Sequence, residues 1–102
     1  MEETTCPACA RYKKTPRGSE ELKDLKTRIN RTIGQLNGIS KMLEDNRYCG
    51  DVLTQISAVK SAIESIGYIV LEEHLKTCVI EQVKIGNNDI MDEALALMKK
   101  LK

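Results

Sequence analysis

The sequence predicts an all-α protein with two long antiparallel helices followed by a short C-terminal helix. Apolar residues recur at three- and four-residue steps through two long stretches, a pattern typical of amphipathic helices. No proline follows Pro16, and only two short polar segments, DNR at 45–47 and IGNND at 85–89, interrupt the pattern. Hydrophobic residues make up 41% of the 102 residues, which is enough for a core, but so few helices bury little surface alone. We therefore expect an obligate oligomer.

Two parts of different composition follow each other along the chain. Residues 1–18 lack apolar periodicity and are expected to form a flexible tail that contains the motif Cys6-Pro7-Ala8-Cys9. Residues 19–102 are expected to form one helical domain. No window approaches the ~20 apolar residues of a membrane span, and no signal-peptide segment follows Met1. We therefore expect a cytoplasmic protein, with no membrane partner, whose four cysteines remain thiols.

The first helix is expected from Ser19 to about Glu44. Ser19 is a candidate N-cap, and Glu20 and Glu21 complement the positive end of the helix dipole. The apolar stripe, in which Thr32 fills one position, consists of Leu22, Leu25, Ile29, Leu36, Ile39 and Leu43. This spacing predicts a seam like that of a coiled coil.

The second helix is expected to start at Tyr48 or Cys49 and to end after about Ile85, with Gly86 as a candidate C-cap. Its stripe consists of Cys49, Val52, Ile56, Val59, Ile63, Ile66 and Val70. The third helix is expected from about Asp89 to Leu101. Its predicted buried residues are Ile90, Ala94, Leu97 and Leu101.

Cys49, His74 and Cys78 are the candidate metal ligands. His74 is the only histidine and lies four residues before Cys78, so both side chains project from one face of the predicted helix. Two thiolates and one imidazole form a soft donor set that suits Cu(I). On the residues alone a second interpretation stays open, in which the histidine is a surface residue and the cysteines are small buried apolar side chains.

The length of the second helix determines how such a site could form. Cys49 and Cys78 are 29 residues apart, which is about 43 Å along one continuous helix. An antiparallel partner helix that crosses near Ala62 and Ile63 would place Cys49 of one chain beside His74 and Cys78 of the other. Two-fold symmetry would create two identical sites. The sequence therefore predicts a metal site between the subunits of an antiparallel dimer.

Basic residues gather near the N-terminus although the net charge is only +1. The stretch from Arg11 to Arg31 holds eight basic and three acidic residues, a local charge of +5. Such asymmetry is expected for contacts with the phosphates of double-stranded DNA. On charge alone, however, a solvated helix face is the simpler interpretation.

Most of the stretch from Arg28 to Val79 resembles the copper-sensitive operon repressor (CsoR) family. The motifs that carry the resemblance are GQLNGI at 34–39, YCxDVLTQISAV at 48–59 and EEHxxxCV at 72–79. The resemblance implies an all-helical DNA-binding repressor whose homotetramer is a dimer of dimers. It also implies one Cu(I) per protomer, held by Cys49 of one subunit and His74 and Cys78 of its neighbour.

The same resemblance favours copper over the other effectors of related repressors. Nickel and cobalt sensors carry more histidines, including one at the position of Cys78. Formaldehyde sensors lack the thiol at the Cys78 position. Sulfur sensors keep both cysteines and lack histidine at the position of His74. The Cys–His–Cys pattern of this chain is therefore the copper pattern.

Further residue roles follow from the resemblance. Tyr48 and Glu93 are expected to form hydrogen bonds that link them to the His74 ring when copper is bound, since a ligating imidazole usually has its second nitrogen oriented by an acceptor. The DNA contacts that the resemblance implies are Arg28, Arg31 and Gln35, and charge alone adds Lys26, Lys41 and Lys60.

The sequence thus predicts a Cu(I)-responsive repressor that binds operator DNA when metal-free and releases it on binding Cu(I), so that copper-resistance genes are transcribed. One alternative is a repressor that senses reactive sulfur through Cys49 and Cys78. The other is a helical copper-buffering protein that does not bind DNA. An enzyme is not expected, because a single histidine without a paired nucleophile offers little catalytic apparatus. Cys6 and Cys9 lie outside the resemblance and are candidate accessory thiols for metal or sulfur chemistry.

Overall fold

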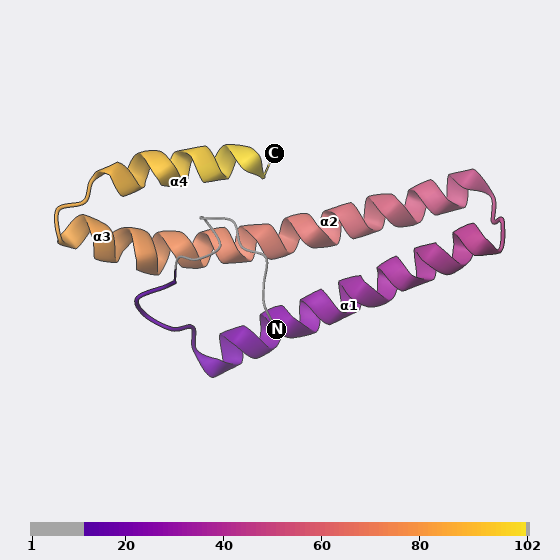
Figure 1. Cartoon of the computed structure of the whole chain (residues 1–102), viewed down its shortest axis with the longest axis horizontal. Coiled ribbons are helices and arrows are strands. Elements are labelled where there is room, and N and C mark those ends of the chain that lie inside the picture. The colour runs from indigo at the N-terminus through magenta and orange to yellow at the C-terminus, as the bar shows by residue number, and fades with distance from the viewer. Residues whose placement is uncertain (1–11, 102) are drawn as a thin grey trace.

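A computed structural model describes residues 12–101 of the protein and shows a helical hairpin with a third helix folded back on it (Figure 1). The elements in chain order are α1 (Ser19–Glu44), α2 (Cys49–His74), a π-helical turn (Leu75–Val79), α3 (Ile80–Lys84) and α4 (Asp89–Lys100). From Cys49 to Lys84 the chain forms one continuous helical rod, with α1 antiparallel to it. The described residues contain no strand. The prediction of an all-α protomer with two long helices and a short one is confirmed.

The start of α1 differs from the prediction by one residue. The N-cap is Gly18, whose backbone N–H donates to the Glu21 carboxylate at 3.1 Å. A glutamate at this position stabilises the first turn by reaching back to the cap residue. Ser19 is therefore the first helical residue, and its prediction as N-cap is wrong. Glu44 ends the helix as predicted, and Asn46, with a φ of 55°, provides the left-handed backbone of the turn into α2.

Two small clusters hold the helices together. The first joins α1 to the N-terminal half of α2 and consists of Ile39, Val52 and Val59, with Met42 packed against them. The second joins the π-turn to α4 and consists of Val79, Ile90 and Ala94, with Leu75 packed against them. Ala94 is 1% exposed, but no large side chain among the described residues is fully buried, so the core of a single protomer is thin.

Helix α4 covers only one end of the rod, which leaves a long apolar surface open. Its C-terminal end packs on α2 at Gly67, where an added Cβ would lie 2.8 Å from a methyl carbon of Leu101. Beyond this contact the same face of α2 is exposed at Leu53, Ile56 and Ile63, whose relative exposures are 63%, 45% and 53%. Ile56 and Ile63 belong to the predicted stripe and Leu53 does not, and α4 lies over the other end of the rod (Figure 1).

The predicted stripe of α1 is likewise divided between core and surface. Leu25, Thr32 and Ile39 are buried. The other stripe positions are exposed, and they are Leu22, Ile29, Leu36 and Leu43. The periodicity therefore predicted the helix correctly, but four of its six apolar positions are exposed in the protomer.

Two glycines give opposite predictions for stability. Gly86 has a φ of 91° at the end of α3, so Gly86→Ala should lower the free energy of unfolding by about 1–2 kcal/mol. Gly38 lies inside α1 with no atom within 4 Å of an added Cβ, so Gly38→Ala should raise it by roughly 0.5–1 kcal/mol. Urea unfolding followed by circular dichroism measures both changes. A loss of stability in Gly38→Ala would show instead that a second chain packs closely on this side of α1.

Candidate metal centre and DNA-binding surface

His74 lies directly before the π-helical turn of the rod, and Cys78 lies within it. His74 is the last residue of α2, and Cys78 belongs to the π-helical turn. Such turns are rare and occur frequently at functional sites. Both side chains line a hollow of about 430 Å³ between α2 and α4, whose other walls include Val70 and Leu97. The structure therefore brings these two candidate ligands to one opening.

The imidazole of His74 has a nitrogen that forms no hydrogen bond with any described residue. Its Nε2 atom is buried and has no hydrogen-bond partner within the described part of the chain. A buried polar atom without a partner costs free energy, so such an atom calls for a physical explanation. A metal ion bound at Nε2 would satisfy it, and the neighbouring thiol of Cys78 is a second soft donor at the same opening.

Cys78 has a positively charged neighbour from the N-terminal segment. The Lys13 ammonium donates to the Cys78 Sγ atom at 3.2 Å and to the Thr77 hydroxyl at 3.1 Å. The Thr77 hydroxyl itself donates to the backbone carbonyl of Glu73 at 2.8 Å. Lys13 also lines the hollow that His74 and Cys78 share. No sequence pattern indicated this contact, because 65 residues separate its partners.

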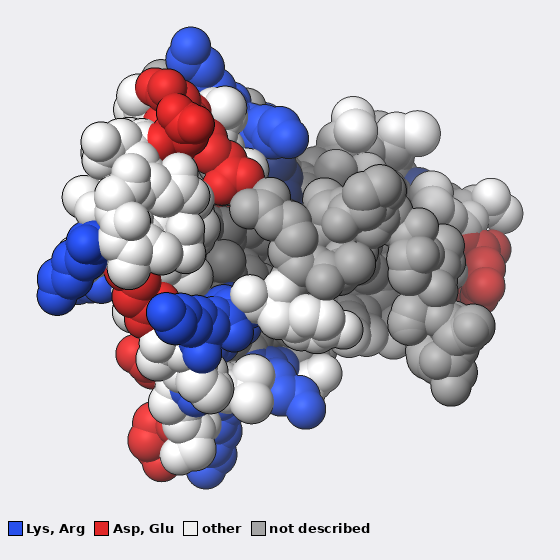
Figure 2. Space-filling view, turned by 60° about the vertical axis from the view of Figure 1, so that its left-hand side comes forward, with Lys and Arg blue, Asp and Glu red and all other residues white. Residues whose placement is uncertain are grey.

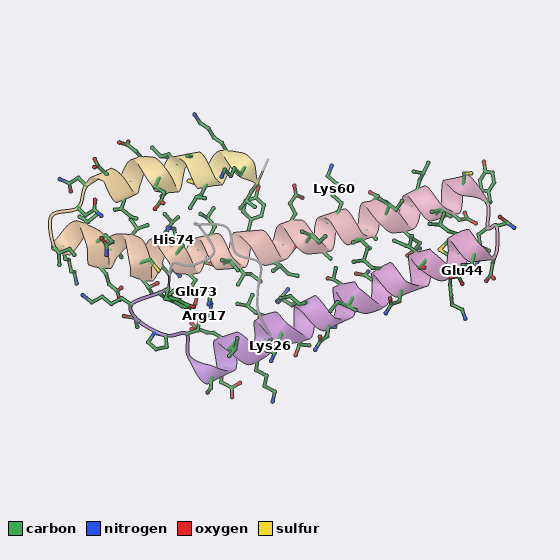
Figure 3. All side chains as sticks on the ribbon, in the orientation of Figure 1. Arg17, Lys26, Glu44, Lys60, Glu73 and His74 are labelled. Atoms are coloured by element: carbon green, nitrogen blue, oxygen red, sulfur yellow. The ribbon has the colours of Figure 1, made fainter. Side chains whose placement is uncertain are left out.

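Two more contacts hold the same segment against the rod. The Arg17 guanidinium pairs with the Glu73 carboxylate at 2.8 Å, with side-chain exposures of 33% and 13% (Figure 3). The Thr15 hydroxyl donates to the Glu81 carboxylate. Residues 13–17 therefore run along the rod beside the candidate ligands, and these residues were not among the predicted site residues.

Cys49, the third candidate ligand, is exposed at the opposite end of α2. The helix between Cys49 and Cys78 is continuous, so the two thiols are about 43 Å apart along it. Within residues 12–101, no group of three or more His, Cys, Asp or Glu side chains is placed to hold a metal ion. One protomer thus supplies two soft ligands at one end and a single exposed thiol at the other.

The two residues predicted to support His74 lie in different places. Glu93 on α4 lines a second hollow, of about 600 Å³, together with His74 and Cys78. Tyr48 precedes α2 beside Cys49, is 75% exposed and lies at the far end of the rod. An alanine side chain at Gly50 would meet the Tyr48 ring at 2.6 Å, so the ring lies against the first turn of α2. Tyr48 therefore accompanies Cys49, and Glu93 accompanies His74.

The residues that the resemblance assigned to DNA lie together on one surface. Arg28, Arg31 and Gln35 line a hollow of about 330 Å³ between α1 and α2. Its α2 wall includes Ala62 and Ser65. Because the hollow is formed by both long helices, its shape depends on how α1 packs against α2.

The three lysines predicted from charge alone do not line the hollow of Arg28, Arg31 and Gln35. Lys26 projects from α1 and Lys60 from α2, on opposite sides of the hairpin (Figure 3). Lys41 is exposed near the end of α1. Figure 2 shows basic and acidic side chains interspersed on the end that carries α3. The structure therefore gathers Arg28 and Arg31, but not the three lysines.

Two further sequence predictions concern the N-terminal cysteines and a membrane span. Cys6 and Cys9, with most of the expected tail, lie outside residues 12–101. Among the helices described, none is long and apolar enough to cross a membrane.

Comparison with known proteins agrees with this geometry. Residues 21–100 match the family described as metal-sensitive transcriptional repressor. The chain is 38% identical over 85 residues to the copper-sensing transcriptional repressor CsoR of Bacillus subtilis (strain 168), covering 82% of this chain and 84% of that protein. It is 51% identical over 59 residues to the copper-sensing transcriptional repressor RicR of Mycobacterium tuberculosis (strain ATCC 25618 / H37Rv), covering 58% of this chain and 62% of that relative.

The fold comparison gives the same family. The crystal structure of the copper-sensing repressor CsoR with Cu(I) from Geobacillus thermodenitrificans NG80-2 superimposes with a TM-score of 0.80 at 36% sequence identity, covering 89% of this chain and 96% of that one. The resemblance predicted from the motifs is thereby confirmed, as is the expectation that the chain is not an enzyme, since the relatives are named transcriptional repressors. A transcriptional repressor acts by binding DNA. The chain belongs to the family of metal-sensitive transcriptional repressors.

Proposed function

We propose that the protein is a Cu(I)-responsive repressor that binds double-stranded operator DNA when metal-free and releases it when Cu(I) binds. Cys49 of one subunit and His74 and Cys78 of its partner would bind one Cu(I) per protomer. When bound, Cu(I) supplies a soft centre that these three ligands satisfy. Release of the DNA would permit transcription of copper-resistance genes.

The observation that carries the proposal is the buried Nε2 atom of His74 beside Cys78. Within the described residues this atom has no partner, and the His74 and Cys78 side chains line one hollow. A third soft donor would complete a three-coordinate Cu(I) site. The only other described cysteine is the exposed Cys49, which a second subunit can supply.

The apolar surface of α2 supports a second subunit as the source of that thiol. Leu53, Ile56 and Ile63 lie on the surface left open by α4. Burying large apolar side chains is worth about 1.5–3 kcal/mol each, so this face favours a partner helix. An antiparallel partner centred near Ile63 would bring each Cys49 to the other subunit's His74 and Cys78. We propose this antiparallel dimer, and a tetramer formed from two such dimers.

The helices suggest how metal binding would reach the DNA. His74 and Cys78 lie where α2, the π-turn and α4 meet, so ligation would change how α4 and α2 pack. Arg28, Arg31 and Gln35 lie in the hollow formed jointly by α1 and α2. A shift of the long helices against each other would therefore alter the arrangement of the residues that contact phosphates.

Copper should weaken the binding of the protein to its own promoter. Coupling free energies between linked sites are typically ~1–3 kcal/mol, which corresponds to roughly 5–150-fold weaker DNA binding. Fluorescence anisotropy of labelled promoter DNA, with reduced protein and anaerobic addition of one equivalent of Cu(I), measures this change. DNA binding that persists at saturating Cu(I) would contradict the proposal and favour sulfur sensing. Absence of any salt-dependent DNA binding would favour copper buffering.

His74→Ala should separate copper binding from DNA release. Two thiolates remain, so the variant should retain some affinity for Cu(I), but it loses the nitrogen that connects the site to the α4 side of the hollow. We expect the affinity of the variant for DNA without copper to match that of the wild type. The factor by which Cu(I) weakens its DNA binding should be smaller than in the wild type by about fivefold or more. Ser61→Ala on the exposed surface of α2 is the control. Normal release by His74→Ala would exclude a role of this nitrogen in the coupling.

A mixing experiment tests whether the site lies between subunits. Cys49→Ala and Cys78→Ala protomers should each bind Cu(I) weakly on their own. After joint refolding, each mixed antiparallel dimer should contain one intact site, which gives about one quarter of an equivalent of tight Cu(I) per protomer if pairing is random. Titration against a chromophoric Cu(I) chelator measures this recovery. If refolding yields mixed dimers by mass spectrometry but no tight site, the proposed ligand arrangement is wrong.

The sulfur-sensing alternative makes a distinct prediction from the same geometry. A disulfide needs Cα atoms within about 7 Å, so Cys49 and Cys78 of one protomer cannot form one across their helix. Treatment with a polysulfide, whose sulfane sulfur accepts the two electrons and leaves as sulfide, would therefore have to link Cys49 of one subunit to Cys78 of another. Non-reducing mass spectrometry of treated protein detects such covalent dimers.

A further inference from the structure

Two of the four cysteines, in the motif Cys6-Pro7-Ala8-Cys9, have no role in the proposed sensor site. The motif precedes the residues that match the repressor family, so it is not part of the matched pattern. Two thiolates separated by two residues can bind one metal ion together, and thiolates select soft ions such as Cu(I) and zinc. A closed zinc site needs four ligands, and one such motif provides only two. The motif therefore fits Cu(I) better than zinc.

The residues that follow the motif favour its metal-binding form. Three of the four residues at 11–14 are basic, namely Arg11, Lys13 and Lys14. Basic neighbours favour the thiolate form of a cysteine, which is the form that binds metal. One Cu(I) with two thiolates carries a net charge of −1, and the same basic residues offset that charge.

The described part of the chain begins at an opening that leads to the candidate ligands. Tyr12, His74 and Cys78 all line the hollow of about 600 Å³, which we call the polar hollow. Its walls include Gln82 and Asn87, which are joined by a hydrogen bond of 2.8 Å. The other hollow at His74 and Cys78 has mostly apolar walls and continues the face of α2 that the proposed partner would cover. The polar hollow would therefore remain as the approach from solvent.

Chain length keeps the motif within reach of the polar hollow. Cys9 precedes Tyr12 by three residues and Cys6 precedes it by six. Because an extended chain spans at most about 3.6 Å per residue, the Cα atom of Cys9 lies within about 11 Å of that of Tyr12, and that of Cys6 within about 22 Å. A short covalent connection keeps two binding groups at a high effective concentration. An ion held by the motif is therefore close to the sensor ligands.

We propose that the thiolates of Cys6 and Cys9 together bind a second Cu(I) per protomer, which the motif can pass through the polar hollow to the sensor site. The second site goes beyond the proposed function, whereas the transfer rests on it. In the transfer, the Cys78 sulfur forms a bond to Cu(I) as the Cys9 sulfur leaves. The partner subunit's Cys49 then displaces Cys6, and the Nε2 atom of His74 completes the ligand set.

This exchange is balanced without an oxidant or a reductant. Copper remains Cu(I) throughout, because each step replaces one electron-pair donor by another. The thiols of Cys49 and Cys78 release their protons, and the thiolates of Cys6 and Cys9 take up the same number. Three donors replace two, so we expect the transfer to run toward the sensor site.

Metal stoichiometry provides the first test, in the reduced full-length protein under anaerobic conditions. A weak chromophoric chelator of Cu(I) serves as competitor, so that a site of two donors can also fill. We expect about two equivalents of Cu(I) per protomer in the wild type and about one in Cys6→Ser/Cys9→Ser. The control Thr4→Ala/Thr5→Ala changes two neighbouring residues and keeps both thiols, so it should bind as much Cu(I) as the wild type.

The rate of DNA release provides the second test. When one equivalent of Cu(I) is supplied as its chelator complex, Cys6→Ser/Cys9→Ser should release promoter DNA severalfold more slowly than Thr4→Ala/Thr5→Ala, because the accepting motif is missing. The final extent of release should be equal, since the sensor ligands are unchanged. Stopped-flow fluorescence anisotropy measures the rate and the extent together.

The outcomes separate this inference from the proposed function. The same Cu(I) stoichiometry in the wild type and in Cys6→Ser/Cys9→Ser, or a single ion shared between two tails, would overturn the two-thiolate site. Equal rates of DNA release in the two variants would overturn the transfer. A wild type that binds the second equivalent through Cys6 and Cys9 but keeps its DNA at saturating Cu(I) would overturn the proposed function and the transfer, and would establish the second site.

Discussion

The continuous helix from Cys49 to Lys84 is the constraint on which the rest of this structure depends. An α-helix is stiff along its axis, so it holds Cys49 and Cys78 about 43 Å apart and prevents any closed site of both thiols within one protomer. The same rod is too long for α4 to cover, which leaves Leu53, Ile56 and Ile63 exposed. Incomplete burial and an incomplete ligand set are therefore two consequences of one helix, and one antiparallel partner would relieve both.

The thin core of the protomer affects how firmly α1 and α4 are held against the rod. The two buried clusters, around Val59 and around Ala94, are separate and contain few residues each. Few apolar contacts fix α1 and α4 to the rod within one chain, so their packing can respond to a modest free energy. A coupling of ~1–3 kcal/mol, typical of linked sites, is small beside the core of a large domain but large beside these clusters.

The periodic parts of the fold could be predicted from sequence, and the contacts between distant segments could not. Apolar spacing and the DNR and IGNND breaks located the three helices within a residue or two, because they report local backbone geometry. The N-cap was missed because Gly18 is capped through the Glu21 side chain. The same spacing could not tell core from open surface, as Leu25 and Ile29 show. The contact of Lys13 with Cys78 leaves no periodic signal, since it joins residues 65 positions apart.

Helix α1 is connected to the rod at two points, at its start and along its middle. Its N-cap, Gly18, directly follows residues 13–17, and its middle forms the hollow of Arg28, Arg31 and Gln35 with α2. Lys13 contacts Cys78 and Arg17 pairs with Glu73, so the segment before α1 is joined to the rod near His74 and Cys78. Because both points belong to one stiff helix, a displacement at either is carried along its length. Helix α1, which carries Arg28 and Arg31, is thus attached to the end of the rod that carries His74 and Cys78, although these arginines lie elsewhere.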